Sequence, residues 1–156
     1  MGIELTLEGI TKTYGKLTAV QGLGFTVKAG ELFALLGPSG AGKSTTVNLI
    51  AGIEKPDQGD IRAGGSSILE LRPQERDFAM VFESYALYPH LTVAENMAFP
   101  LRAPNRATRY SAADIQKRVA ETARLLEIHE LLARYPKELS GGQKQRVGLG
   151  RALVRD

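Results

Sequence analysis

Apolar and polar residues in the first 90 positions follow patterns that predict short strands. Five segments show such a pattern: residues 3–8, 17–28, 31–36, 60–63 and 78–82. In the first, Ile3, Leu5 and Leu7 fall on one face, which is typical of a half-buried strand. The last is continuously apolar, FAMVF, which is typical of a strand buried on both faces.

Helical periodicity first occurs after the third predicted strand, and from about residue 92 onward it is the main pattern of the chain. The pattern predicts helices over residues 43–51, 93–98, from Ser111 to about 126, 129–134 and 142–154. Thr92 with Glu95 forms a capping box, and Asp114 stands at the third position of the helix that Ser111 opens. Gly52 follows the first helix as its expected end.

Strands and a helix alternate first, and helices follow. This order predicts an α/β fold with an N-terminal antiparallel β subdomain and an inserted helical subdomain. We expect a nucleotide-binding α/β core over 1–91, the helical subdomain over 92–139, and a loop with its helix over 140–156.

A glycine-rich loop lies between the third strand and the first helix. Residues 37–45, GPSGAGKST, match the phosphate-loop pattern G-x-x-x-x-G-K-[ST]. Glycines let backbone N–H groups turn inward around an anion, and the helix N-terminus adds its positive dipole end. Lys43 is expected to reach the β- and γ-phosphates of a nucleotide, and the Ser44 hydroxyl to ligate Mg²⁺. The alternative, a glycine turn without a ligand, is disfavoured by the strand–loop–helix context.

A second loop of small residues precedes the last helix. Residues 139–143, LSGGQ, combine exposed backbone N–H groups, a serine hydroxyl and a helix N-terminus, which together suit an anion. Taken alone, the segment is equally well explained by Ser140 capping the helix.

Composition narrows the class of protein further. The 156 residues are 43% hydrophobic and 24% charged, with a net charge of +3 and no cysteine, which excludes disulfides and thiolate metal sites. No apolar stretch is long enough to predict a membrane span or a signal peptide. The basic residues form no stripe with interleaved aromatics, so nucleic acid is not an expected partner.

The two loops together resemble those of the ATP-binding cassette (ABC) ATPases, as Walker A and signature motifs. The stretch VFESYALYPHLTVAENMAFPLR between them is most similar to ATPase subunits of carbohydrate importers. The resemblance extends from residue 3 to residue 156, and 97 positions separate Lys43 from Ser140, too few for the long coiled coil of chromosome and repair ATPases. An unrelated P-loop kinase or GTPase, the main alternative, does not need the signature.

The resemblance implies a role for each matching residue. The predicted contacts to ATP are Tyr14, Val20, Gly37, Pro38, Ser39, Gly40, Ala41, Gly42, Lys43, Ser44, Thr45 and Glu83. Tyr14 would stack on the adenine, and Val20 would lie beside it. The signature residues Leu139, Ser140, Gly141, Gly142 and Gln143 would contact the ATP of a second subunit in a head-to-tail dimer.

The segment 84–92 resembles the part of these ATPases that contacts the membrane permease. Tyr85, Leu87, Tyr88 and His90 would line a groove for a coupling helix. His90 has no partner at metal-ligand spacing, so catalysis or metal binding is not expected of it. The implied location is the cytoplasmic face of the cell membrane.

Two positions depart from the family pattern. Glu83 stands where a glutamine usually senses the γ-phosphate and Mg²⁺, and a carboxylate makes ATP binding more dependent on the metal. No Walker B strand, catalytic Glu or switch His follows the signature, so we expect an N-terminal fragment of low stability. Two functions stay open from the sequence: part of a transport ATPase, or a module that binds ATP with little or no hydrolysis.

Overall fold

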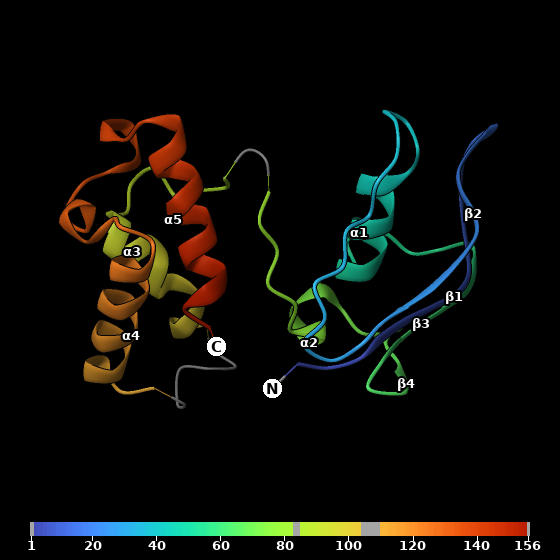
Figure 1. Ribbon diagram of the computed structural model, residues 1–156, viewed down its shortest axis with the longest axis horizontal. Helices are drawn as coiled ribbons and strands as arrows, with labels where there is room; N and C mark the ends of the chain where they lie inside the picture. The colour runs from blue at the N-terminus through green and yellow to red at the C-terminus, as the bar shows by residue number, and fades with distance from the viewer. Residues whose placement is uncertain (1, 83–84, 104–109, 156) are drawn as a thin grey trace. The chain divides into compact units, whose positions relative to one another are not determined.

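A computed structural model describes residues 2–82, 85–103 and 110–155, in two compact units, Met1–Phe78 and Ala79–Asp156 (Figure 1). Each unit has a core of its own. We describe the units separately. No helix in the described ranges is both long and apolar enough to cross a membrane.

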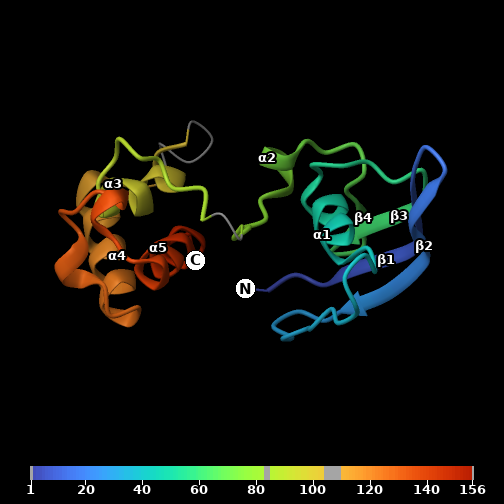
Figure 2. The ribbon, with the colours of Figure 1, turned by 90° about the horizontal axis from the view of Figure 1, so that it is seen from above.

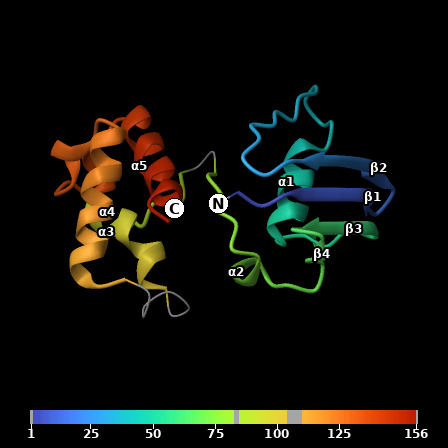
Figure 3. The same cartoon turned by 60° about the horizontal axis from the view of Figure 1, so that its bottom comes forward.

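Unit 1 is built on an antiparallel sheet of four strands in the order β2-β1-β3-β4 (Figures 2 and 3). The strands are β1 Leu5–Tyr14, β2 Leu17–Val27, β3 Gln58–Ala63 and β4 Ser66–Ser67. Leu7 pairs with Phe25 of β2 on one side and with Ile61 of β3 on the other, which sets the register of the central strand. The first, second and fourth predicted strands are confirmed, with shifted ends.

Helix α1, Lys43–Ala51, covers one face of this sheet (Figure 3). Its Leu49 is fully buried with Leu7, Ile10 and Ile61 in the core of the unit. Gly52 ends the helix with a φ of 78°, a left-handed conformation that favours glycine, as the sequence predicts. A short helix that periodicity does not reveal, α2 Pro73–Arg76, follows the sheet.

The predicted strands over 31–36 and 78–82 are wrong. Neither segment is in a strand, and Leu32 and Leu36 are 99% and 86% exposed. A strand is stable only beside a hydrogen-bonded neighbour, and the sheet within the described ranges pairs β1 to β4 alone. An apolar run indicates that a segment can be buried, but it does not show that a second strand lies beside it to form hydrogen bonds. Of the first segment, Phe33 does pack, stacking on Phe25 of β2 at 4.7 Å between ring centroids.

Unit 2 is helical (Figure 1). Its helices are α3 Val93–Ala98, α4 Ala112–Leu125 and α5 Gly141–Leu153, with 3-10 turns at Phe99–Arg102, His129–Leu131 and Pro136–Glu138. Ile115, Val119 and Ala123 lie on the buried face of α4, as their spacing predicts. The helix predicted over 129–134 is only a 3-10 turn.

Helices α3, α4 and α5 each begin with a capping box, in which two residues exchange side-chain to backbone hydrogen bonds. Thr92 and Glu95 exchange hydrogen bonds at α3, and Ser111 and Asp114 do so at α4. Each cap satisfies two backbone N–H groups that the helix leaves unpaired. Both predicted starts are confirmed.

Candidate functional site

A cleft of about 370 Å³ in unit 1 collects most of the residues that the sequence assigns to a nucleotide. Its lining residues are Tyr14, Leu17, Thr18, Ala19, Ser39, Gly40, Gly42, Lys43, Ser44 and Thr45. They come from the end of β1, the start of β2, the glycine-rich loop and the first turn of α1. The volume lies within the usual range for a small-molecule site.

Gly42 is the residue whose backbone shapes the floor of the cleft. It precedes α1 with a φ of 77°, in the left-handed region. A Cβ atom at this position would overlap the carbonyl oxygen of Ala19 and lie 2.9 Å from Cγ2 of Val20. The loop therefore lies directly on β2, and only glycine allows both the conformation and the contact.

Lys43 turns back into the loop that precedes it. Its Nζ donates hydrogen bonds of 2.7 Å to the carbonyl oxygens of Gly37 and Pro38. The ammonium group thus lies inside the loop, where it would meet the phosphates of a nucleotide. Anions are also favoured here by the N-terminus of α1, whose first turn carries no acidic residue.

Ser44 and Thr45 follow Lys43 on the first turn of α1 and line the cleft. Ser44 is exposed, so its hydroxyl is available to a metal ion or a phosphate oxygen. Thr46, by contrast, is 2% exposed, and its hydroxyl donates to the carbonyl oxygen of Gly42 at 2.9 Å. Thr46 therefore holds the loop to the helix, whereas Ser44 is the most exposed hydroxyl of this turn, and a hydroxyl oxygen suits Mg²⁺.

Tyr14 and Val20 occupy different environments. Tyr14 lines the cleft and is 44% exposed, with Lys12 Nζ 5.3 Å from its ring centroid. A half-exposed ring at the edge of the cleft suits stacking on a planar base. Val20 is 7% exposed, belongs to the core of unit 1 and is not part of the cleft lining.

The remaining predicted contacts divide into two groups. Gly37, Pro38 and Ala41 are exposed and belong to the loop but do not line the cleft. Glu83, the second predicted Mg²⁺ ligand, lies outside the described residues, as does Ser84. Within the described ranges, no group of three or more His, Cys, Asp or Glu residues could hold a metal ion.

The cleft also contains residues that sequence reasoning missed. Leu17, Thr18 and Ala19 line it beside Tyr14. A turn at Tyr14-Gly15 followed by a strand brings these residues back past the tyrosine, so the hairpin was the signal that could have found them.

The signature segment forms the start of α5 in unit 2. The Oγ atom of Ser140 accepts from the N–H of Gln143 at 3.3 Å, and Oε1 of Gln143 accepts from the N–H of Ser140 at 2.9 Å. This pair is a capping box, so the structural role weighed for Ser140 is present. Leu139 is 6% exposed and anchors the segment in the core of unit 2.

The two signature glycines are not needed for this fold. Gly141 and Gly142 are exposed, and a Cβ atom on either would meet nothing within 4 Å. Neither has a positive φ. Glycine here leaves open space over unpaired backbone N–H groups at a helix N-terminus, which is an arrangement that a phosphate can approach closely.

The loop ahead of α3 is held by one buried amide. Asn96 is fully buried, accepts from the N–H of Tyr88 at 2.8 Å and donates to the carbonyl oxygens of Tyr88, Leu91 and Thr92. His90 lies in this loop and is exposed. The loop is therefore fixed from beneath while its outer side chains stay accessible.

The chain matches a protein-family model over most of its length. The family model described as "ABC transporter" matches residues 20–156, which include both glycine-rich loops.

Curated relatives cover nearly the whole chain. The sn-glycerol-3-phosphate import ATP-binding protein UgpC of Cereibacter sphaeroides is 48% identical over 98% of this chain and 43% of its own length. The trehalose import ATP-binding protein SugC of Mycobacterium tuberculosis is 49% identical over 97% of this chain and 38% of its own length. The chain therefore spans about 40% of the length of these curated relatives.

Among solved structures, the ATP-binding cassette MJ0796 is similar in a dimeric post-hydrolysis state with ADP and Pi. The two share 32% sequence identity with a TM-score of 0.83, over 96% of this chain and 69% of the other. The predicted P-loop fold is confirmed by this likeness.

Proposed function

This chain belongs to the ABC transporter ATPase family, and from that premise we propose that its cleft binds the triphosphate and base of MgATP. The observation that carries the proposal is the position of Lys43, whose ammonium lies within the glycine-rich loop on two carbonyl oxygens. Tyr14, at the edge of the same cleft, is the proposed platform for the adenine. Val20 contributes indirectly, because it supports Gly42 from below.

The proposed Mg²⁺ site uses the hydroxyl of Ser44 and the carboxylate of Glu83. Hydroxyl and carboxylate oxygens suit Mg²⁺, which takes few protein ligands and shares the phosphates of its nucleotide. The structure supports the Ser44 half, because this hydroxyl is exposed on the first turn of α1 and lines the cleft. When bound, the metal neutralises phosphate charge, while Lys43 and the N–H groups of α1 orient the tail.

We propose that the signature segment serves a second subunit. Ser140, Gly141 and Gly142 present a hydroxyl and backbone N–H groups to open space, in a helical unit that contributes no residue to the cleft lining of unit 1. A head-to-tail dimer, in which each signature segment contacts the γ-phosphate on its partner, gives these groups a ligand. Dimers are known for the similar cassette MJ0796.

The proposed biological role is solute import driven by ATP. Relatives at 48% and 49% identity are named for import of sn-glycerol-3-phosphate and of trehalose, so a sugar or a sugar phosphate is the proposed class of cargo. Permease subunits are the proposed membrane partners, with Tyr85, Leu87, Tyr88 and His90 as the contact surface. This would place the chain on the cytoplasmic face of the cell membrane. ATP hydrolysis is the proposed activity of the whole protein.

A binding titration tests the nucleotide site. Lys43→Ala removes the ammonium, and charge-assisted hydrogen bonds are worth about 1.5–3 kcal/mol each. Because Lys43 must first leave the carbonyl oxygens of Gly37 and Pro38, we expect the lower end, about tenfold weaker binding of MgATP. Lys55→Ala is the matched control, since the Lys55 side chain is exposed and its ammonium forms an ion pair with Glu70 at 3.2 Å, away from the cleft lining. Equal affinity of the Lys43 variant and the control would rule the site out.

A dimerisation assay tests the signature segment separately. Ser140→Ala removes a hydroxyl but leaves the glycines, so it should weaken ATP-dependent dimerisation while leaving nucleotide affinity of the monomer unchanged. Size-exclusion chromatography with light scattering, with and without MgATP, measures the difference. A variant that dimerises as well as the original chain would contradict the role of Ser140.

A further inference from the structure

The turn that opens the loop before α3 has an unfavourable backbone. Tyr85 and Ala86, neither of them glycine, have φ values of 60° and 44°. Side chains with a Cβ rarely adopt this left-handed region, and two in succession persist only where the surroundings hold them. Within the described part of unit 2, the question is which group holds this turn.

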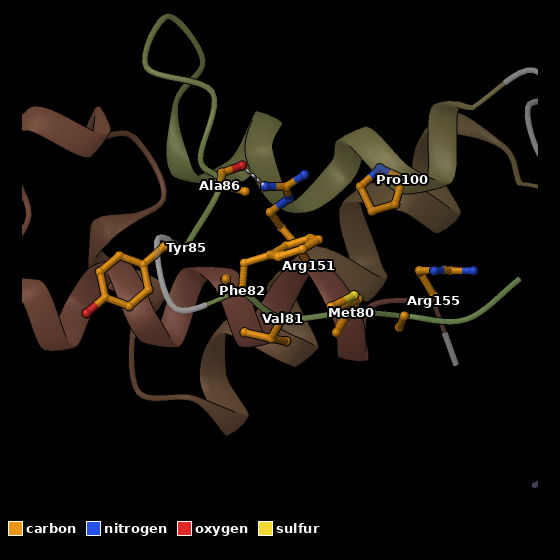
Figure 4. Close-up of a pocket in the computed structure, with 11 residues that line it drawn as sticks. Met80, Val81, Phe82, Tyr85, Ala86, Pro100, Arg151 and Arg155 are labelled. Atoms are coloured by element: carbon orange, nitrogen blue, oxygen red, sulfur yellow. Dashed lines mark hydrogen bonds between the residues drawn. The ribbon is translucent and has the colours of Figure 1, made fainter. Parts of the chain in front are cut away.

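Arg151 of helix α5 supplies that contact. Its Nη1 donates to the carbonyl oxygen of Ala86, as Figure 4 shows. Its guanidinium carbon lies 5.0 Å from the ring centroid of Tyr88, a ring that also neighbours Phe99 at 4.5 Å and His90 at 6.2 Å between centroids. One side chain thus binds both the carbonyl of the strained turn and the aromatic residue two positions later.

The rest of the loop is fixed by a different helix. Asn96 of α3 bonds to the backbone of Tyr88 and Leu91, and makes no bond to Tyr85 or Ala86. The contact with α5 at the turn comes from Gly148 and Arg151, which lie three positions apart on one face of the helix. A Cβ on Gly148 would lie 3.6 Å from the carbonyl oxygen of Tyr85, an ordinary contact.

The turn borders a cavity on one side. Tyr85, Ala86, Gly148 and Arg151 all line a cavity of about 130 Å³ (Figure 4). Where the turn borders this cavity it has fewer van der Waals neighbours, so hydrogen bonds matter more in holding its backbone. Two are present: the N–H of Tyr85 donates to the carbonyl oxygen of Phe82 at 3.0 Å, and Arg151 donates to the carbonyl oxygen of Ala86 from helix α5.

We propose that Arg151 is a positioning residue that fixes the loop 85–88 to the signature helix α5. Arginine suits the task because its planar guanidinium stacks on a ring with its face while donating from its edge. A lysine ammonium can donate to the same carbonyl but cannot stack in this way. For transport, the inference rests on the proposed function: α5 begins at the signature segment, so the tether would make the permease-facing loop follow that helix.

Spin labelling tests the tether without any ligand. The chain has no cysteine, so His90→Cys places a single label on an exposed residue of the loop. With Arg151 present, the electron paramagnetic resonance spectrum should show a restricted label. Arg151→Gln should give a mobile component, and Arg151→Lys, which retains a donor, should fall between the two.

A matched control separates the tether from general damage to α5. Arg146 lies on the same helix, is half-exposed, and bonds to Leu126 and Glu127 instead of the loop. Arg146→Gln should leave the label restricted. Hydrogen exchange should show faster exchange at 85–88 in the Arg151 variant and unchanged exchange in α5, which a merely destabilised helix would not give.

Two outcomes overturn the proposal. The first is a label that stays restricted in Arg151→Gln. The second applies if Arg151→Gln does not fold: the test then uses Arg151→Lys and Tyr88→Leu, and a label that stays restricted in both variants contradicts the proposal. MgATP affinity is measured in the same samples. If the original chain does not bind MgATP, the proposed function is refuted, but the label mobility still tests the contact between Arg151 and the loop.

Discussion

Replacing Arg76 with methionine should destabilise unit 1 far more than the position of Arg76 in a four-residue helix suggests. The side chain is only 8% exposed. Its donors serve four backbone carbonyl oxygens, at 2.8 Å to Leu49, 2.9 Å to Ile50, 3.0 Å to Leu71 and 3.2 Å to Leu69. The first two belong to the last turn of α1, where the carbonyl oxygen of Leu49 also accepts from the N–H of Gly52 at 3.2 Å.

The expected loss follows from these four bonds. The bond to Leu49 is fully buried, so removing its donor costs about 2–3 kcal/mol, and the three part-buried bonds cost about 0.5–1 kcal/mol each. Methionine replaces most of the apolar stem, so little packing is lost. Burial also lowers the pKa of Arg76, because the charged guanidinium is partly desolvated, and this offsets part of the gain. We expect a net destabilisation of about 3–4 kcal/mol.

Hydrogen exchange with mass spectrometry is the suitable assay, because it reports on peptides of unit 1 separately from those of unit 2. Peptides from β1 and α1 should exchange several hundredfold faster in Arg76→Met. Arg72→Met is the control: Arg72 lies in the same segment, but its side chain is exposed and forms its ion pair with Glu75. The reasoning would be refuted if Arg76→Met lowered the free energy of unfolding of unit 1 by less than 1 kcal/mol, or by no more than Arg72→Met does.

Three further predictions concern the cleft, the helix caps and the metal. Gly42→Ala should abolish MgATP binding in a titration, because the new Cβ would strike Ala19 and the residue would need a left-handed φ; retained affinity would show that the loop has another shape. Hydrogen bonds from Thr92 lower the pKa of Glu95 below its usual 4.5, so its stabilisation is present above pH 4.5 and is lost as the pH falls through the folded value. Thermal unfolding of Glu95→Gln between pH 5 and 3 should therefore vary less with pH than that of the original chain, and an equal slope would be inconsistent with the cap. Glu83→Gln should make ATP binding less dependent on Mg²⁺, since a carboxylate about 5 Å from a phosphate charge costs about 3 kcal/mol without metal; equal dependence in titrations with and without Mg²⁺ would disprove this.

Local features were the predictable part of this chain. The caps at Thr92 and Ser111 depend on residues three positions apart, so the sequence alone fixes them. The same holds for the loop that ends at Gly42, because its glycines encode the backbone conformation directly.

Features that depend on distant neighbours were not predictable. The apolar run over 31–36 was expected to pair in a sheet, but pairing needs a neighbour that periodicity does not specify. Arg76 and Arg151 resemble ordinary surface arginines in the sequence. Their roles depend on carbonyl oxygens of Leu49 and Ala86, 27 and 65 positions away. Val20, which the resemblance places beside the base, lies in the core of unit 1, an environment that its spacing in the sequence does not reveal.

The bonds from Lys43 to Gly37 and Pro38 affect how nucleotides would exchange. Two carbonyl oxygens of the chain itself accept from the ammonium, so these hydrogen bonds hold the loop in its curved conformation. On the proposed function, a phosphate that binds would replace these carbonyl oxygens as the partner of the ammonium. The carbonyl oxygens would take its place again when the phosphate leaves. We therefore expect nucleotide entry and release to exchange the partners of the Lys43 ammonium while the loop keeps its conformation.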